Sequence, residues 1–407
     1  MRNMSFVHVN GKVSNFWLIA ILFSLLLMAN GISFASATPQ ISAGEYHSLA
    51  LKSDGTVWAW GNNSDGQLGD RETINRRIPV EVLGLKEVIA IAGESTNSLV
   101  LKSDGTVWVW WNNSDGQLGD GTTKKKYFPV QTQGLKDVIA IAGGNSHGIA
   151  LKSNGTVWTW GNNKNGQLGD NTTTNRNIPV QIYKFKGVVA IAGGGFHSLA
   201  LKSNGTVWAW GYNNEGTLGD RTNVNRRTPV KVNRLSSVIA VASGYRHNLA
   251  LKSDGTVWAW GLNCYGQLGE GTTINRNTPV RVSGLSGVIA ISCKGNHNLA
   301  LKSDGTVCAW GSNFYAQLGD GTEEDRNTPV QVSNLGGVIA IATGNSHSLA
   351  LKSDGTVWAW GLNGFGQLGD DSPRDRHTPV QVKNINLIQS VTQTPAMIST
   401  QKANSSQ

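Results

Sequence analysis

The sequence is organised around a thirteen-residue stretch, residues 49–61, that returns at fixed intervals of fifty residues. The other copies begin at Leu99, Ile149, Leu199, Leu249, Leu299 and Leu349, with no insertion or deletion between them. A unit of this size cannot bury its own faces, so it has to pack against its neighbours in the array. The chain is therefore an array of seven equivalent supersecondary units.

Each copy is predicted to form a β-hairpin, because two runs rich in Leu, Val and Trp flank an Asp-Gly or Asn-Gly pair. That pair is typical of a two-residue turn, which would place Leu51 opposite Trp58. Side chains alternate between the faces of a strand, so the small side chains Ala50 and Ala59 would share one face. The other face would carry the large side chains Leu49, Leu51, Trp58 and Trp60. Such a sheet has no solvated side and needs a neighbour on both faces.

Each repeat offers four strands. They are an alternating large-and-small segment such as 88–92, the two hairpin strands, and a short proline-led segment such as 79–82 that suits a sheet edge. Seven such sheets stacked face to face in a closed ring give every face a neighbour, whereas a straight solenoid would need capping repeats that the sequence lacks. We predict an all-β fold, a seven-bladed β-propeller of four-stranded antiparallel blades over residues 38–391, with the first strand of each blade nearest the axis.

The two ends of the array compete for one place. Residues 41–44 and 388–391 both match the first strand of a repeat. We expect the N-terminal segment to take the place, because it runs directly into its own second strand.

Residues 1–37 read as a secretory signal peptide. Arg2 and Lys12 precede an apolar run over 16–29, and Ala35-Ser36-Ala37 provides a small-x-small cleavage site. The alternative is an uncleaved anchor helix, for which fourteen apolar residues are few. We therefore expect an exported protein, either secreted, periplasmic or on the cell surface.

Residues 392–407, rich in Ser, Thr and Gln, are predicted to be a disordered polar tail.

The net charge of +9 is spread around the array. Lys52, Arg76 and Asp70 recur in the other copies with few exchanges, which favours solvated or ion-paired structural positions. The one local basic run, residues 124–126, is too short to indicate a nucleic-acid partner, and none is expected.

Histidine recurs at the position of His47 in six of the seven copies, with Asn97 in the second. Equivalent positions on different blades are too far apart to share one metal ion, so we predict a repeated structural hydrogen bond, which Asn97 can also make. No Ser/His/Asp set, metal-ligand spacing or complete phosphate loop stands out from the repeat. We predict no catalytic residues, no metal site and no cofactor.

The chain has three cysteines, so at least one thiol has no intrachain disulfide partner. A disulfide between Cys293 and Cys308 is compatible with the sequence but is not required by it.

The repeat resembles a known family. Gly44-x-x-His47-Ser48-Leu49-Ala50-Leu51, Gly55-x-Val57-x-x-Trp60-Gly61 and Gly66-Gln67-Leu68-Gly69 are similar to the repeat of the regulator of chromosome condensation (RCC1) family, over about 350 residues in seven copies. The resemblance implies a seven-bladed propeller. The founding member is an exchange factor for a small GTPase and uses an inserted β-hairpin wedge, to which nothing here corresponds because all copies have equal length. Other propellers of this type, including exported bacterial inhibitors of β-lactamases, are similar in working as protein-binding discs, so the resemblance implies protein binding.

The positions that vary between copies are the ones that the scaffold does not need. They correspond to residues 45–46, 62 and 64–65 of the first copy and are expected at one end of the ring. In the first three copies the second set is polar, whereas the later copies carry large apolar groups and an arginine. These predicted partner-binding residues are Tyr212, Tyr245, Arg246, Leu262, Tyr265, Phe314, Tyr315, Leu362 and Phe365. Aromatic residues and arginine carry much of the energy of protein interfaces, although these loops could instead pack on themselves.

Three functions are compatible with the sequence. The first is a monomeric, non-enzymatic exported propeller that binds a protein partner through these residues. The second is an exchange factor for a small GTPase, and the third is binding of carbohydrate or an envelope polymer, because exposed aromatic rings also stack on sugars.

Overall fold

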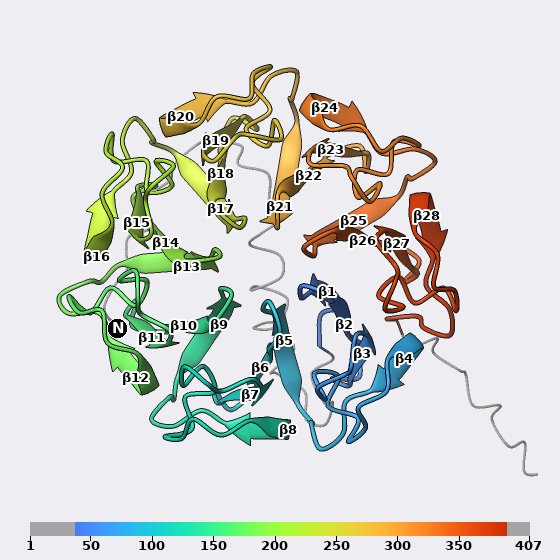
Figure 1. Ribbon diagram of the computed structural model, residues 1–407, viewed down its shortest axis with the longest axis horizontal. Coiled ribbons are helices and arrows are strands. Elements are labelled where there is room, and N and C mark those ends of the chain that lie inside the picture. Colours follow the sequence, from blue (N-terminus) through green and yellow to red (C-terminus); the bar gives the residue numbers. More distant parts are fainter. Residues whose placement is uncertain (1–36, 389–407) are drawn as a thin grey trace, which may run out of the picture.

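The computed structural model describes residues 37–388 and shows a closed ring of seven four-stranded antiparallel sheets (Figure 1). Each blade is made of four consecutive strands from one repeat, so the predicted fold is confirmed. The predicted signal peptide, apart from its last residue, lies outside the described residues, as does the polar tail. Within residues 37–388 there is no helix of the length and apolar character needed to span a bilayer.

The strands fall into four concentric sets. The innermost strands are β1 (Gln40–Ala43), β5 (Val88–Gly93), β9 (Val138–Gly143), β13 (Val188–Gly193), β17 (Val238–Ser243), β21 (Val288–Lys294) and β25 (Val338–Thr343). The second strands are β2 (His47–Leu51), β6 (Ser98–Lys102), β10 (His147–Lys152), β14 (His197–Lys202), β18 (His247–Lys252), β22 (His297–Lys302) and β26 (His347–Lys352). The third strands are β3 (Val57–Gly61), β7 (Val107–Trp111), β11 (Val157–Gly161), β15 (Val207–Gly211), β19 (Val257–Gly261), β23 (Val307–Gly311) and β27 (Val357–Gly361). The outer strands are β4 (Arg76–Glu81), β8 (Lys126–Gln131), β12 (Arg176–Gln181), β16 (Arg226–Lys231), β20 (Arg276–Arg281), β24 (Arg326–Gln331) and β28 (Arg376–Gln381).

The first strand of each repeat lies nearest the central axis, as predicted (Figure 1). These strands are small and aliphatic, and small side chains allow seven of them to converge around a narrow centre.

The register of the central hairpin differs from the prediction by one residue. Leu51 lies opposite Val57, and Ala50 lies opposite Trp58. The loop has three residues, because the N–H of Lys52 donates to the carbonyl of Thr56 and Gly55 adopts φ +81°. The Asp54 side chain accepts hydrogen bonds from both the N–H and the hydroxyl of Thr56 and so closes this wider turn.

A shift of one residue reverses the face on which every side chain of one strand lies. One face of a blade therefore combines Leu49, Leu51, Val57 and Ala59, while the other combines Ala50 with both tryptophans, Trp58 and Trp60. The predicted segregation into a large and a small face is wrong. The need for a neighbour on both faces is confirmed, because both sides of the hairpin lie in hydrophobic clusters.

Each interface between blades inserts an indole into a leucine-lined face. Between the fourth and fifth blades, Trp260 and Ala250 pack against Leu199 and Leu201, and all four side chains are buried. A buried tryptophan removes roughly 200 Å² from water, worth about 5 kcal/mol of transfer free energy. The alanine leaves room for the indole beside it.

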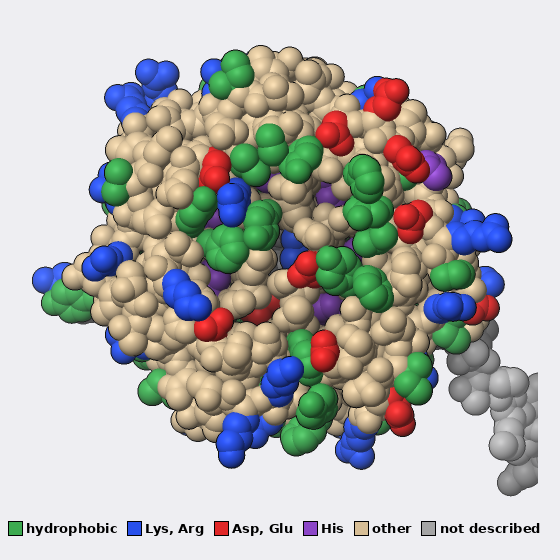
Figure 2. Space-filling model, viewed as in Figure 1, with side chains coloured by type: hydrophobic (Ala, Val, Ile, Leu, Met, Phe, Trp, Pro, Cys, Tyr) green, Lys and Arg blue, Asp and Glu red, His purple; other side chains and the backbone are tan. Residues whose placement is uncertain are grey.

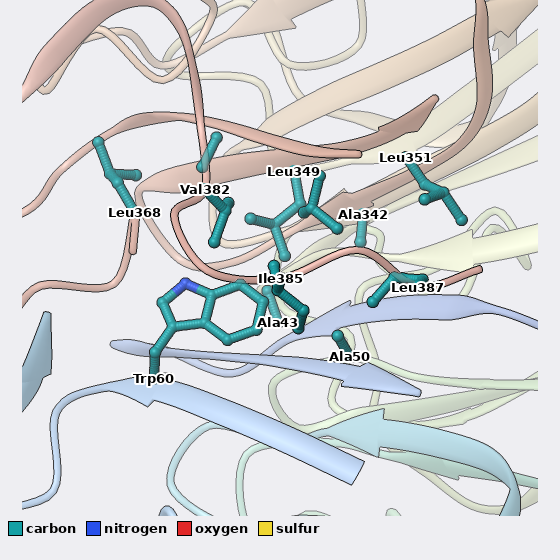
Figure 3. Close-up of a cluster of buried hydrophobic side chains, with 12 residues drawn as sticks. Ala43, Ala50, Trp60, Ala342, Leu349, Leu351, Leu368, Val382, Ile385 and Leu387 are labelled. Carbon is teal, nitrogen blue, oxygen red and sulfur yellow. The ribbon is translucent and has the colours of Figure 1, made fainter. Parts of the chain in front are cut away.

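The ring closes through the same contact. Figure 3 shows Trp60 and Ala50 of the first blade against Leu349 and Leu351 of the last. The N-terminal segment forms the innermost strand of the first blade, β1, as predicted. The C-terminal segment still reaches this blade, because the carbonyl of Leu387 accepts a hydrogen bond from Ser53 N–H.

A second contact repeated around the ring is a set of side-chain hydrogen bonds between neighbouring blades. The carbonyl of Gln167 in the third blade accepts hydrogen bonds from Trp210 Nε1 and Ser198 Oγ of the fourth, each at 2.8 Å. The Ser198 hydroxyl also bonds to Nε2 of His147, at 2.9 Å. All six histidines of the repeat make such a bond to a serine or asparagine of the next blade, so the predicted structural role is confirmed.

Asn97 does not make the predicted equivalent bond. Its side-chain amide donates to the carbonyl of Asn112 in its own blade, at 2.8 Å. The partner position in the next blade is Gly148, which has no side chain to bond with, and the Trp160 ring lies where a Cβ there would be. Both members of the bond are thus absent at this one interface.

The buried histidines should make the protein lose stability in mild acid. Burial lowers the pKa of His47, His147, His297 and His347 to about 3, and that of His197 and His247 to about 4. Between those values and about 6.5 the unfolded chain binds protons that the folded chain does not, so stability rises with pH in this window and is lost as pH falls. Each histidine contributes up to about 1.4 kcal/mol per pH unit.

The urea concentration at the midpoint of unfolding should therefore fall steeply as the pH is lowered from about 7 to about 5. Ordinary carboxylates titrate below this interval, so they do not contribute to the change. A His197→Asn variant should show a shallower dependence. Midpoints that stay constant over this interval would contradict the expectation.

The seam offers a matched test of the interblade hydrogen bond. Trp60 Nε1 is buried without a partner among the described residues, whereas Trp210 Nε1 donates to Gln167. Trp60→Phe and Trp210→Phe remove the same atoms from equivalent sites, but only the second breaks a hydrogen bond. We expect Trp210→Phe to cost about 1 kcal/mol more in the free energy of unfolding, measured by chemical denaturation. Equal losses would show that the bond contributes nothing.

Candidate functional site

One end of the ring carries two kinds of connection. The inner turn joins the first and second strands of a blade, and the long loop joins the third and fourth strands. They meet within each blade, as where Asn62 N–H donates to the carbonyl of Tyr46 at 2.8 Å. The variable positions of the repeat therefore lie together, as predicted, on what we call the loop face.

Each long loop is held by a charged pair at its base. Arg76 lies 2.7 Å from Asp70, and Asn63 also donates to this carboxylate. Burial alone would raise the pKa of Asp70, but the hydrogen bonds from Arg76 and Asn63 lower it below its ordinary value. Equivalent pairs occur in all seven blades, the weakest being Lys126 with Asp120 at 4.0 Å, so the predicted ion-paired role is confirmed. The loops are thus rigid supports for their variable residues.

The predicted binding residues fall into separate groups on this face. In the first, Arg246 of the fifth blade lies over the rings of Tyr212 and Tyr245, at 5.0 and 5.4 Å from their centroids. Its guanidinium also pairs with Glu215 at 3.0 Å. Phe196 completes the group, with its ring 5.3 Å from that of Tyr245. These side chains are half-buried and partnered with one another, which is the packing described above as the alternative to binding.

The second group surrounds a cavity of about 600 Å³ at the sixth blade. Tyr265, Phe314 and Tyr315 line it, and the Phe314 and Tyr315 rings meet edge to face at 4.9 Å. Phe314 is 72% exposed and the two tyrosines about 40%. The acidic run 323–325 forms another part of the wall. Large apolar groups and carboxylates therefore face the same hollow.

The third group lies at the seam, where the Phe365 ring is 5.1 Å from Tyr46 of the first blade. Leu262 and Leu362 are half-buried at the bases of their loops and belong to no cluster of rings. Figure 2 shows hydrophobic side chains gathered around the central opening. Tyr46 and Phe196 were missed by the sequence analysis, although both occupy the repeat position of Arg246, which could have revealed them.

The centre of the loop face contains a second cavity, of about 460 Å³, lined by glycines of the inner turns and by Lys294. The Lys294 ammonium donates to the carbonyls of Ala43 and Gly93, at 2.9 and 2.5 Å, and so joins the sixth blade to the first and second across the axis. Burial lowers its pKa to about 8, against the charges of Glu94 and Glu45. The carboxylate of Glu94 is buried with no hydrogen-bond partner among the described residues, and burial raises its pKa well above the ordinary value. Five of the seven repeats have glycine where Glu94 and Lys294 occur.

All three cysteines are free, because β22 separates the strands of Cys293 and Cys308 and Cys264 lies on a loop. Within residues 37–388 no group of three histidine, cysteine or acidic side chains is placed to hold a metal ion.

Comparison with known families identifies matches over nearly the whole ring. The model of the RCC1-like domain matches residues 27–340, and the model of the regulator of chromosome condensation (RCC1) repeat matches residues 338–367 and, in a second form, 354–393.

Curated proteins match over about one repeat. RCC1 domain-containing protein RUG3, mitochondrial, from Arabidopsis thaliana is 44% identical over 55 residues, and the probable E3 ubiquitin-protein ligase HERC6 from Homo sapiens is 46% identical over 50. These matches cover 13% and 12% of this chain but only 12% and 5% of the relatives.

Solved structures match over most of the chain. Human WBSCR16 superimposes with a TM-score of 0.72 at 26% identity, covering 80% of this chain and 94% of its own. Prp20p from Saccharomyces cerevisiae, whose binding to Gsp1p and histones has been characterised, gives a TM-score of 0.72 at 23% identity and covers 86% of each chain.

The lysine that crosses the axis should support the ring. Lys294→Met keeps the length of the side chain but removes the ammonium group, which donates hydrogen bonds to two carbonyls. We therefore expect the free energy of unfolding to fall by about 2 to 3 kcal/mol. Lys231→Met, on an exposed position of an outer strand, should cost much less. The two variants are compared by chemical denaturation, and equal midpoints would show that Lys294 is not a structural contact.

Proposed function

The chain belongs to the RCC1-like domain family, and we propose that it is a non-enzymatic scaffold that binds a protein partner on its loop face. We further propose that it is exported, on the basis of the leader-like sequence of residues 1–37. The binding residues are the exposed aromatic groups of the fifth to seventh blades, centred on Tyr265, Phe314, Tyr315 and Phe365. The arginine group of the fourth and fifth blades borders this surface. The scaffold acts as a monomer.

The observation that carries the proposal is the exposure of these rings on loops that are otherwise fixed. Phe314 is 72% exposed, although the loop that presents it is held at its base by the Arg326–Asp320 pair at 2.8 Å. Rigid, exposed aromatic side chains lose little entropy on binding and are enriched among the residues that dominate interface energy. A monomer with no partner gains nothing from keeping several of them in water.

The comparisons support a binding role of this general kind. Prp20p shares the propeller and binds Gsp1p and histones, so the same ring can serve as a protein-binding surface. The founding exchange factor uses an inserted β-hairpin wedge. No such insertion occurs in this chain, because all seven repeats have the same length.

The test is a double variant at two exposed rings. Tyr315→Ala/Phe365→Ala should leave the melting temperature nearly unchanged and reduce the capture of a partner from the extracytoplasmic fraction at least about tenfold, as measured by quantitative mass spectrometry of the retained proteins. The matched control is Phe128→Ala/Tyr183→Ala, which removes one exposed phenylalanine and one exposed tyrosine outside the loop face.

The other outcomes reject the proposal or favour one of the alternatives. Equal capture by the two double variants would overturn the proposal. Nucleotide release from a GTPase would establish the exchange factor, and binding of glycans without any protein would establish the carbohydrate-binding alternative. A large fall in melting temperature would show that the rings belong to the core.

A further inference from the structure

The loop face repeats the same socket between neighbouring blades. The long loop of one blade forms one wall, and the inner turn of the next blade forms the other. At the junction of the fourth and fifth blades, the socket is occupied by the chain's own Arg246. Its guanidinium lies over Tyr212 and Tyr245 and pairs with Glu215 at 3.0 Å.

The junction of the sixth and seventh blades has the same backbone but lacks this side chain. Ser346 stands at the position of Arg246, one hundred residues further along the chain. The two backbones are held alike, because the carbonyl of Ser346 accepts from Leu362 N–H and that of Arg246 accepts from Leu262 N–H, each at 2.9 Å. The short serine leaves the cavity of about 600 Å³ described above.

The walls of this cavity carry the same kinds of group that hold Arg246, but at other repeat positions, since Ser312, Tyr315 and Asn345 stand where Tyr212, Glu215 and Tyr245 do. Tyr265, Phe314 and Tyr315 supply ring faces, and Glu323 and Glu324 supply carboxylates. The Oδ1 atom of Asn296, also in the lining, is buried and has no hydrogen-bond partner among the described residues. Aromatic faces, carboxylates and a free acceptor together match a planar cation with several N–H donors.

The acidic wall is peculiar to this blade. The sixth repeat has Glu323 and Glu324 where the others have Thr, Asn, Ile, Val, Lys, Pro or Arg. Both carboxylates are exposed and make only surface pairs, Glu323 with His377 at 2.8 Å and Glu324 with Arg326 at 3.4 Å. Surface pairs of this kind are worth little, so an incoming guanidinium can replace them.

We propose that the cavity between the sixth and seventh blades, which we call the Ser346 socket, binds an arginine side chain from a basic segment of the partner. This rests on the proposed function and gives the partner a chemical character. Arginine fits better than lysine, because its flat guanidinium stacks on rings and pairs with carboxylates through two parallel bonds. The chain as a whole is basic, with a net charge of +9, so its overall charge does not attract basic peptides and binding has to come from the local acidic wall.

The experiment uses a fluorescein-labelled tetra-arginine peptide, followed by fluorescence anisotropy at low ionic strength. We expect saturable binding to the wild-type protein, weaker binding of tetra-lysine and none of tetra-glutamine. Ser346→Arg places the chain's own guanidinium in the socket, as Arg246 does, and should weaken tetra-arginine binding by roughly tenfold while every aromatic and acidic group remains.

A second variant does not depend on how Ser346→Arg folds. Glu323→Gln/Glu324→Gln changes two exposed side chains and should weaken binding to a similar extent. Glu72→Gln/Glu81→Gln changes the net charge equally at exposed positions of the first repeat and should leave binding as in the wild type.

The proposal is overturned if tetra-arginine does not bind, or if it binds the wild type, Ser346→Arg and the double Gln variant equally. Preference for tetra-lysine would also overturn it. Its failure can be told from that of the proposed function, because Ser346→Arg with full capture of the protein partner rejects the socket alone. Full capture by Tyr315→Ala/Phe365→Ala rejects the proposed function.

Discussion

The structure depends on one contact, made seven times: an indole of one blade buried against the leucines of the blade before it. Trp260 and its equivalents are fully buried, and the short side chain beside each indole, alanine in six blades and Val100 in the second, keeps the blades close. The carbonyl that accepts from the indole N–H belongs to the start of a long loop, as with Gln167 and Trp210. The same contact that stacks the blades therefore fixes the loops that form the functional face. At the seam Trp60 is packed in the same way although its indole N–H has no partner among the described residues, as expected if burial of the ring, worth about 5 kcal/mol, outweighs a hydrogen bond worth about 1 kcal/mol.

How much of this could be predicted from the sequence follows from the regularity of the repeat. Seven copies of equal length determine the ring, the number of strands and the end at which the variable residues meet. The register could not be predicted from the Asp-Gly pair, because the Asp54 side chain bonds to Thr56 and favours a three-residue turn that the dipeptide alone does not reveal. The role of Asn97 could not be predicted without knowing that Gly148 lies opposite it. Both errors concern the partner of a side chain, which is two residues away for Asp54 but in the next blade for the position of Asn97.

In the candidate site, too, the position of the variable residues could be predicted from the repeat, but the contacts of each side chain could not. The positions that differ between otherwise constant repeats predicted the loop face and its aromatic residues. Arg246 and Phe314 looked alike in that respect, yet one is held by Glu215 and two rings while the other is exposed. Glu94 and Lys294 were overlooked because each departs from the repeat only once. Single departures do not stand out among variable positions, although these two place ionisable side chains near the axis of a ring that otherwise has glycine there.

The repeat also explains how a uniform ring can acquire a specific surface. The residue on the inner turn varies from blade to blade, and the sockets differ in how they are filled. Arginine fills the socket at the junction of the fourth and fifth blades, tyrosine packs across it at the seam, and serine leaves it open between the sixth and seventh. Such exchanges cost the scaffold little, since the interface contacts lie deeper, at the tryptophans. Specificity can therefore change one socket at a time, without altering the packing that holds the ring closed.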